Sequence, residues 1–75
     1  MMPLSLCRNG DEVEVVEILG GRGIRERLFE MGIYPGVKVF IVNNSYHGPI
    51  VIALNSARVA LGRGIAEKIF VKPLN

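Results

Sequence analysis

The segment Met31–Gly36 constrains the fold of this chain more than any other, because it ends a helix and begins a strand within one short stretch. Upstream of it, Ile24, Leu28 and Met31 recur at positions i, i+4 and i+7. This spacing predicts an apolar stripe on a helix of about two to three turns. Gly32 follows where a residue in the left-handed conformation would end that helix.

The residues after Gly32 predict a fold-back and then a tight turn. Ile33 can pack onto the last helical turn, as the residue after such a glycine commonly does. Pro35 fixes its φ angle and Gly36 tolerates a positive one, so this pair predicts the turn. Gly32, Pro35 and Gly36 are therefore interpreted as structural turn residues, and a strand is expected from Val37 onward.

Alternation of apolar and polar residues predicts five short strands and a mostly-β fold. Val13 and Val15 share one face, whereas Val16 and Ile18 follow one residue out of phase, which indicates a β-bulge. Short strands at this spacing, with one helix inserted after the first long strand, predict a small barrel. The side chains expected to be largely buried in its core are Val15, Val39, Ile41, Ile52, Val59, Leu61 and Ile69.

Length and composition predict one domain covering residues 1–75, since 49% apolar and 21% charged residues suffice for a hydrophobic core. The single cysteine, Cys7, excludes an internal disulfide and is typical of a reducing compartment. No secretory signal is visible, nor an apolar run of the roughly 20 residues that a membrane span needs. We therefore expect a cytoplasmic protein without direct membrane insertion.

The formal net charge of +2, from nine basic and seven acidic residues, does not by itself indicate a nucleic-acid partner. Arg22 and Glu26 stand four residues apart and predict an ion pair on a solvated helix face. A dedicated anion site built from Arg22, Arg25 and Arg27 is the alternative interpretation. The first strand is acidic on its polar side, where it carries Asp11, Glu12, Glu14 and Glu17.

Residues suited to catalysis or metal binding are sparse. The single histidine, His47, and the single aspartate, Asp11, would have to converge by chance to form a Ser-His-Asp triad. The sequence has no phosphate loop of the Gly-Lys-Ser/Thr type. Cys7 and His47 are the only soft or borderline metal ligands, and neither has a second ligand at zinc-type spacing. The chain is therefore predicted not to be an enzyme, to need no cofactor, and to bind neither ferrous iron nor nucleotide tightly.

Five sets of residues occur in the order found in one known family. They are Leu4 and Leu6 before Asn9-Gly10; Val15 to Ile18 before Gly20-Gly21; Arg27-Leu28 leading into Met31-Gly32-Ile33 and Pro35-Gly36; Gly48-Pro49 before an apolar strand; and Ser56, Arg58 to Leu61, Ala66 and Ile69 to Val71. With these residues the chain resembles the ferrous iron transport protein A family (FeoA-like domains) over nearly its full length. Gly62-Arg63-Gly64 departs from the family by being richer in glycine.

The resemblance implies an SH3-like β-barrel. It also implies a small cytosolic accessory protein of the bacterial or archaeal ferrous iron uptake system. A protein of this kind would act by binding the membrane Fe²⁺ transporter, which carries its own cytosolic GTPase domain.

A nucleic-acid-binding barrel is the alternative function. Residues 10–15, followed by glycines, resemble the start of a KOW-type RNA-binding segment. RNA-binding barrels usually show a denser Lys/Arg surface and aromatic stacking groups, whereas the acidic first strand here opposes the approach of phosphates. No nucleic-acid partner is therefore expected.

Some apolar residues of the predicted strands point away from the core, and the helix can cover only part of them through Leu28, Phe29 and Met31. An apolar patch with aromatic anchors and a polar, orienting rim is typical of an interaction site. We expect this patch to contact the transporter's GTPase domain or, in a weak homo-oligomer, another copy of the chain. The partner-binding residues predicted on this basis are Arg22, Arg25, Tyr34, Phe40 and Phe70.

Overall fold

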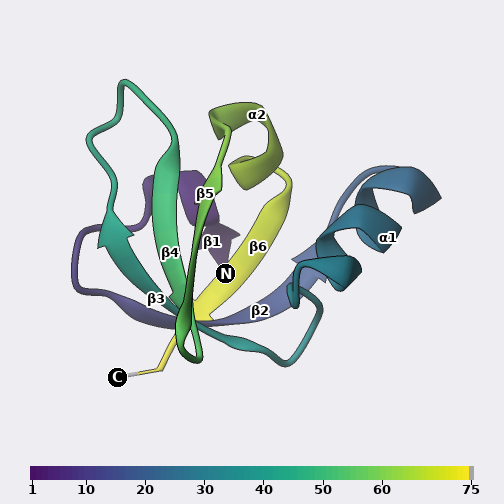
Figure 1. Ribbon diagram of the computed structural model, residues 1–75, viewed down its shortest axis with the longest axis horizontal. Helices are drawn as coiled ribbons and strands as arrows, with labels where there is room; N and C mark the ends of the chain where they lie inside the picture. The colour runs from purple at the N-terminus through teal and green to yellow at the C-terminus, as the bar shows by residue number, and fades with distance from the viewer. Residues whose placement is uncertain (75) are drawn as a thin grey trace.

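Six antiparallel strands form one curled sheet in the computed structural model, which describes residues 1–74 (Figure 1). In chain order the elements are β1 (Met2–Pro3), the 3₁₀-helix η1 (Leu4–Leu6), β2 (Glu12–Ile18), α1 (Arg22–Glu30), β3 (Lys38–Asn43), β4 (Ile50–Leu54), β5 (Ala57–Leu61), α2 (Arg63–Ala66) and β6 (Ile69–Pro73). The strands lie in the order β1-β6-β2-β3-β4-β5. Strand β2 is central, because it pairs with β3 on one side and with β6 on the other.

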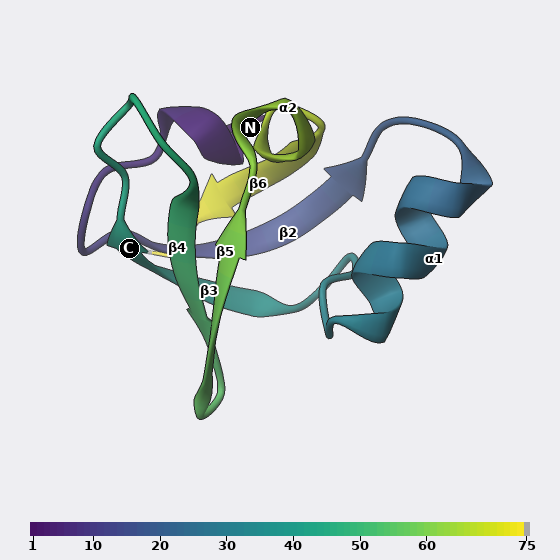
Figure 2. The ribbon, with the colours of Figure 1, turned by 45° about the horizontal axis from the view of Figure 1, so that its top comes forward.

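The predicted mostly-β small barrel, with one helix after its first long strand, is confirmed. The five predicted strands correspond to β2 through β6, and Figure 2 shows how strongly the sheet curls. Strand β1 was not predicted, since two residues are too few for an alternating pattern to be recognised. No helix within residues 1–74 has the length and apolar character needed to cross a bilayer.

The core lies inside the curled sheet and is close to the predicted one. Six of the seven predicted side chains are buried: Val15, Val39, Ile41, Ile52, Leu61 and Ile69. Val59 is only half-buried, because β5 is an edge strand and no further strand shields its outer side. Leu4, Cys7 and Ala66 are also buried, so η1 and α2 close one end of the barrel.

The predicted bulge in β2 is present. The register between β2 and β6 shifts between Val15 and Glu17, which leaves Val16 as the extra residue. Val15 is buried, Val16 is exposed, and Ile18 returns to the core. The bulge bends β2 and increases its twist, which lets one strand take part in both halves of the curled sheet.

Helix α1 ends in a Schellman motif, as the sequence predicts. Gly32 has φ of +87°. Its N–H donates to the Phe29 carbonyl at 2.9 Å, and the Ile33 N–H donates to the Leu28 carbonyl at 2.8 Å. Ile33 and Leu28 are both buried, which is the apolar contact that usually accompanies this cap.

The turn after the cap returns the chain to the central strand. The Val37 N–H donates to the Tyr34 carbonyl at 3.1 Å, and Gly36 at the third position has φ of +99°, as a type II turn requires. The Gly36 N–H then donates to the Val15 carbonyl at 2.8 Å, and the Val15 N–H donates to the Val37 carbonyl at 2.9 Å. The predicted turn therefore connects α1 to β3 and is held against β2 by two backbone hydrogen bonds.

Replacement of Gly32 should destabilise the fold through its backbone conformation. A Cβ at this position would meet only a Leu54 methyl group at 4.0 Å, so the cost is conformational rather than steric. We expect Gly32→Ala to lower the free energy of unfolding by about 1–2 kcal/mol, and Gly32→Val to lower it further because valine is β-branched. Urea unfolding of the purified variants measures this.

Gly23 provides the matched control. It lies in α1 without a positive φ, and a Cβ added there would meet no atom within 4 Å beyond its chain neighbours and the backbone of its own helix. Gly23→Ala should be neutral or stabilising by up to about 1 kcal/mol. Equal stabilities of Gly32→Ala and Gly23→Ala would contradict the capping account.

Candidate functional site

Helix α1 stands beside the end of the sheet rather than over its middle (Figures 1 and 2). Only Leu28 is fully buried among its residues, with Ile24 half-buried beside it. Leu28, Phe29 and Met31 were expected to cover part of the outer face of the sheet, but of these three only Leu28 is buried. Phe29 is 64% exposed, because it lies one position around the helix from the buried Leu28 and so points outward.

Phe29 and Tyr34 form an exposed aromatic pair at the joint between α1 and the turn. Their ring centroids are 5.4 Å apart and the ring planes are inclined by 48°. Aromatic rings prefer such tilted arrangements at this distance. Tyr34 is itself 43% exposed, so both rings are held in place while presenting apolar area to solvent.

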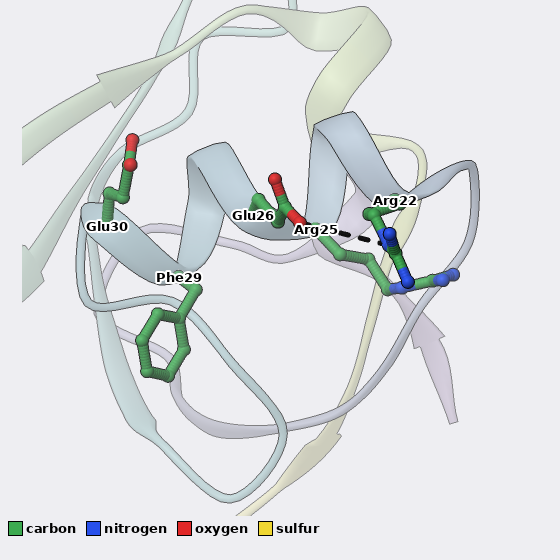
Figure 3. Close-up of a pocket in the computed structure, with 5 residues that line it drawn as sticks. All are labelled: Arg22, Arg25, Glu26, Phe29 and Glu30. Atoms are coloured by element: carbon green, nitrogen blue, oxygen red, sulfur yellow. Dashed lines mark ion pairs between the residues drawn. The ribbon is translucent and has the colours of Figure 1, made fainter.

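Two shallow hollows flank this aromatic pair. One, of about 300 Å³, is lined by residues of β2, α1 and the turn, namely Val16, Glu17, Ile18, Arg25, Phe29, Ile33, Tyr34 and Pro35. The other, of about 410 Å³, runs along the exposed face of α1 and is lined by Arg22, Arg25, Glu26, Phe29 and Glu30 (Figure 3). Six residues that line these hollows form the helix–turn surface: Val16, Arg22, Arg25, Phe29, Tyr34 and Pro35.

The charges of the helix–turn surface come from the first turns of α1. Arg22 forms the predicted pair with Glu26, at 3.8 Å between Nε and Oε1, and both side chains are highly exposed. An exposed pair of this kind contributes little to stability, so Arg22 can exchange partners readily. Arg25 is oriented by donating from Nη1 to the Gly20 carbonyl at 2.8 Å. Both arginines line the hollow along the exposed face of α1 (Figure 3).

The structure divides the predicted partner-binding residues among different places. Arg22, Arg25 and Tyr34 belong to the helix–turn surface. Phe40 lies opposite Glu12 at the start of β2, whereas Phe70 lies opposite Glu17 near its end. Five residues of strand separate these two positions, or about 15 Å. Phe70 is half-buried beside Pro3 of β1, so neither phenylalanine lines the hollows around Tyr34.

A buried polar cluster centred on Asn44 holds the segments around η1 and α2 together. The Asn44 Nδ2 donates to the Ser5 carbonyl at 3.0 Å and to the Cys7 carbonyl at 2.7 Å. Its Oδ1 accepts from the Tyr46 N–H at 3.1 Å and from the Arg63 guanidinium. One amide thereby joins η1, the loop after β3 and the start of α2.

Arg63 is stacked over Tyr46 in the same cluster, with its guanidinium carbon 5.4 Å from the ring centroid. Its Nε is buried without a hydrogen-bond partner among residues 1–74, so the cation–π contact offsets part of the cost of burial. Asn44, Tyr46 and Arg63 were not singled out from the sequence. Their hydrogen bonds to Ser5, Cys7 and to one another include separations of 19 and 39 residues along the chain, and no local pattern marks such pairings.

Cys7 behaves as a core residue. It is fully buried, and burial, together with the nearby Asp11 carboxylate, raises the pKa of its thiol to about 11. A protonated, enclosed thiol is a poor metal ligand. His47 lies exposed in the loop before β4. Within residues 1–74, no three His, Cys, Asp or Glu side chains gather where they could hold a metal ion.

A curled six-stranded antiparallel sheet with a helix inserted between β2 and β3 defines a small SH3-like barrel domain. Within this class, the chain belongs to the FeoA domain family, whose model matches residues 2–73. The family connects the chain with ferrous iron transport.

Individual relatives agree with this assignment. An Fe(2+) transport protein A from Methanocaldococcus jannaschii is 40% identical over 96% of this chain and 87% of its own length. The crystal structure of an iron uptake regulatory protein (FeoA) superposes with a TM-score of 0.92 at 38% identity, covering 97% of both chains. A manganese-dependent transcriptional repressor contains a similar domain, with a TM-score of 0.86 at 28% identity over 96% of this chain and 41% of that one.

Removal of the Asn44 side chain should destabilise the barrel strongly. Asn44→Ala removes the side-chain hydrogen bonds to the Ser5 carbonyl and the Arg63 guanidinium, and it leaves the Cys7 carbonyl with only the Tyr46 hydroxyl at 3.3 Å. We expect a loss of about 2–4 kcal/mol of unfolding free energy, measured by urea titration. The neighbouring exposed Asn43 is the control, and Asn43→Ala should change stability by less than about 0.5 kcal/mol.

Stability should also depend on the Cys7 thiol at high pH. The raised pKa means that the folded state keeps the thiol protonated where the unfolded state ionises it. The contribution of the protonated Cys7 thiol to the free energy of unfolding is therefore complete below about pH 9. It is lost as the pH rises toward 11. Between pH 8.5 and 10.5, the free energy of unfolding should fall by about 1–2 kcal/mol more in the native protein than in Cys7→Ala. Parallel pH dependences of the two proteins would contradict this account.

Proposed function

We propose that this protein is a cytoplasmic accessory of a membrane ferrous iron transporter and acts by binding the transporter's cytosolic GTPase domain through the helix–turn surface. The proposal joins two findings. Membership of the FeoA domain family supplies the connection to ferrous iron uptake. The exposed pair Phe29 and Tyr34, flanked by Arg22 and Arg25, supplies the chemistry of an interaction surface.

The observation that carries the proposal is an aromatic pair exposed on a rigid support. Phe29 and Tyr34 lie on either side of the Schellman cap, so the fold orders their backbone before any partner arrives. Rigid aromatic side chains contribute much contact area at little cost in conformational entropy, and they are the usual anchors of protein interfaces. Arginines beside them can orient an acidic partner and accelerate its association.

A role in binding rather than in catalysis or iron carriage follows from the same residues. The helix–turn surface presents arginine and aromatic side chains, which suit protein contacts and do not ligate ferrous iron. In this proposal the protein alters the transporter by contact and neither stores nor transfers the metal itself.

The alternative of RNA binding is less well supported by the charge distribution. Glu12 and Glu17 are exposed on β2, the strand at the centre of the sheet, and Glu14 is engaged by Lys72 at 3.9 Å. Carboxylates in this position oppose phosphate groups. Retention on a polyanion column at moderate salt would favour the RNA-binding alternative.

Co-purification tests the proposed contact. Tagged protein is captured from detergent-solubilised membranes of cells that contain the cognate transporter. Phe29→Glu places a charge at the centre of the helix–turn surface and should lower the recovered transporter at least about tenfold. Arg25→Glu should lower it in the same direction by reversing a rim charge.

Phe40→Glu is the matched control. Phe40 is 43% exposed and undergoes the same chemical change, but it lies on β3, away from the helix–turn surface. This variant should recover as much transporter as the native protein, and urea unfolding establishes that all variants are folded. Full recovery of transporter by folded Phe29→Glu, or equal losses with Phe29→Glu and Phe40→Glu, would overturn the proposed surface.

A further inference from the structure

Strand β5 has one edge without a partner strand. It pairs with β4 through five residues in register, from Ala57 opposite Leu54 to Leu61 opposite Ile50. It is the last strand of the sheet, and Figures 1 and 2 show its other edge facing the side on which α1 stands. In an edge strand, every second residue directs its N–H and C=O groups outward, where another strand can bind them.

An apolar groove lies where α1 faces the end of β5 and the start of α2. It has a volume of about 190 Å³ and is lined from α1 by Ile24, Arg27, Leu28 and Met31, from the end of β5 by Ala60 and Leu61, and from the start of α2 by Gly62 and Ile65. An apolar cavity of about 150 Å³ accommodates a benzene molecule, so this groove can hold one large apolar side chain. Ala60 and Gly62 carry little or no side chain, so another backbone can approach the end of β5 closely.

The charges around the groove are positive. Arg27 is the single charged residue in its lining. Arg58 lies exposed on β5. Neither arginine forms an ion pair within residues 1–74, where the two salt bridges are Arg22 with Glu26 and Lys72 with Glu14. A carboxylate brought to this groove therefore meets uncompensated positive charge.

We propose that this groove binds an extended segment of a partner protein, which adds to the sheet as a strand beside β5. The segment inserts one large apolar side chain between α1 and β5, and its flanking carboxylates face Arg27 and Arg58. Main-chain hydrogen bonds to β5 supply affinity in this mode, while the apolar pocket and the arginines select the sequence. The inference concerns a site other than the helix–turn surface and does not depend on the identity of the transporter.

A synthetic peptide tests the proposal on the isolated protein. The probe is an eight-residue peptide that alternates glutamate with leucine and valine, titrated into ¹⁵N-labelled protein. Amide shifts should change along β5 and at the groove residues Ile24 and Ile65. Two further peptides carry N-methyl groups on one or the other alternate set of backbone nitrogens. Only the set that faces β5 should abolish binding, because strand addition uses alternate N–H groups.

Two arginine variants separate the groove charge from general electrostatics. Arg27→Glu should weaken binding of the unmethylated peptide roughly tenfold. Arg22→Glu is the matched control, since it makes the same charge change on the same helix outside the groove and should bind nearly as the native protein does. If Arg27→Glu proves unfolded by its amide spectrum, Arg58→Glu on the exposed face of β5 takes its place.

Several outcomes would overturn the proposal. Equal binding of both N-methylated peptides would exclude strand addition, and shift changes centred on Phe29 and Tyr34 would place the peptide on the helix–turn surface instead. No binding at millimolar peptide would reject the groove as a site for this chemistry. Self-association that the peptide reverses would make a second copy of the chain the occupant. None of these results bears on co-purification with the transporter, so the two proposals fail independently.

Discussion

The pairing of β2 with both β3 and β6 is the interaction on which the rest of the structure depends. A strand that serves both halves of a curled sheet must bend, and the bulge at Val16 provides the bend while Val15 and Ile18 stay in the core. Between β2 and β3 the chain leaves the sheet to form α1. It can return only because Gly32 and Gly36 adopt positive φ angles and the Gly36 N–H binds the Val15 carbonyl. The central strand β2 therefore fixes the position of α1 relative to the sheet.

Two regions of the barrel are held together by different means. Beside α1 the packing is apolar and local, through Leu28 and Ile33 around the Schellman cap. Where η1 meets α2, a buried polar cluster around Asn44 joins the two, because the carbonyls of Ser5 and Cys7 point inward and must be satisfied there. The apolar region leaves the side chains of Phe29 and Tyr34 exposed, whereas the polar region uses its side chains to hold the fold together.

Helix α1 consequently presents two faces with different chemistry. Its outer face, with Arg25 and Phe29, suits contact with a folded surface. Its other flank, with Ile24 and Arg27, forms a groove with the unpaired edge of β5 and suits an extended chain. Because the bulge, the cap and the turn fix α1 to the sheet, both faces are ordered before a partner binds, which lowers the entropic cost of binding. On the two proposals above, one helix of this small domain offers two kinds of contact.

Local sequence determined strands β2 to β6 and helix α1, but not β1 or η1. Alternating apolar residues gave the strands, and the phase change after Val15 gave the bulge. Gly32, Pro35 and Gly36 gave the cap and the turn, since each of these signals depends on a few neighbouring residues. Only the tertiary structure decided which exposed residues share a surface. The rings of Phe29 and Tyr34 lie side by side, whereas Phe40 and Phe70 lie far apart along β2. In the interior, Asn44 contacts Arg63. Strand register and helix rotation decide these placements, and no local pattern in the sequence reveals them.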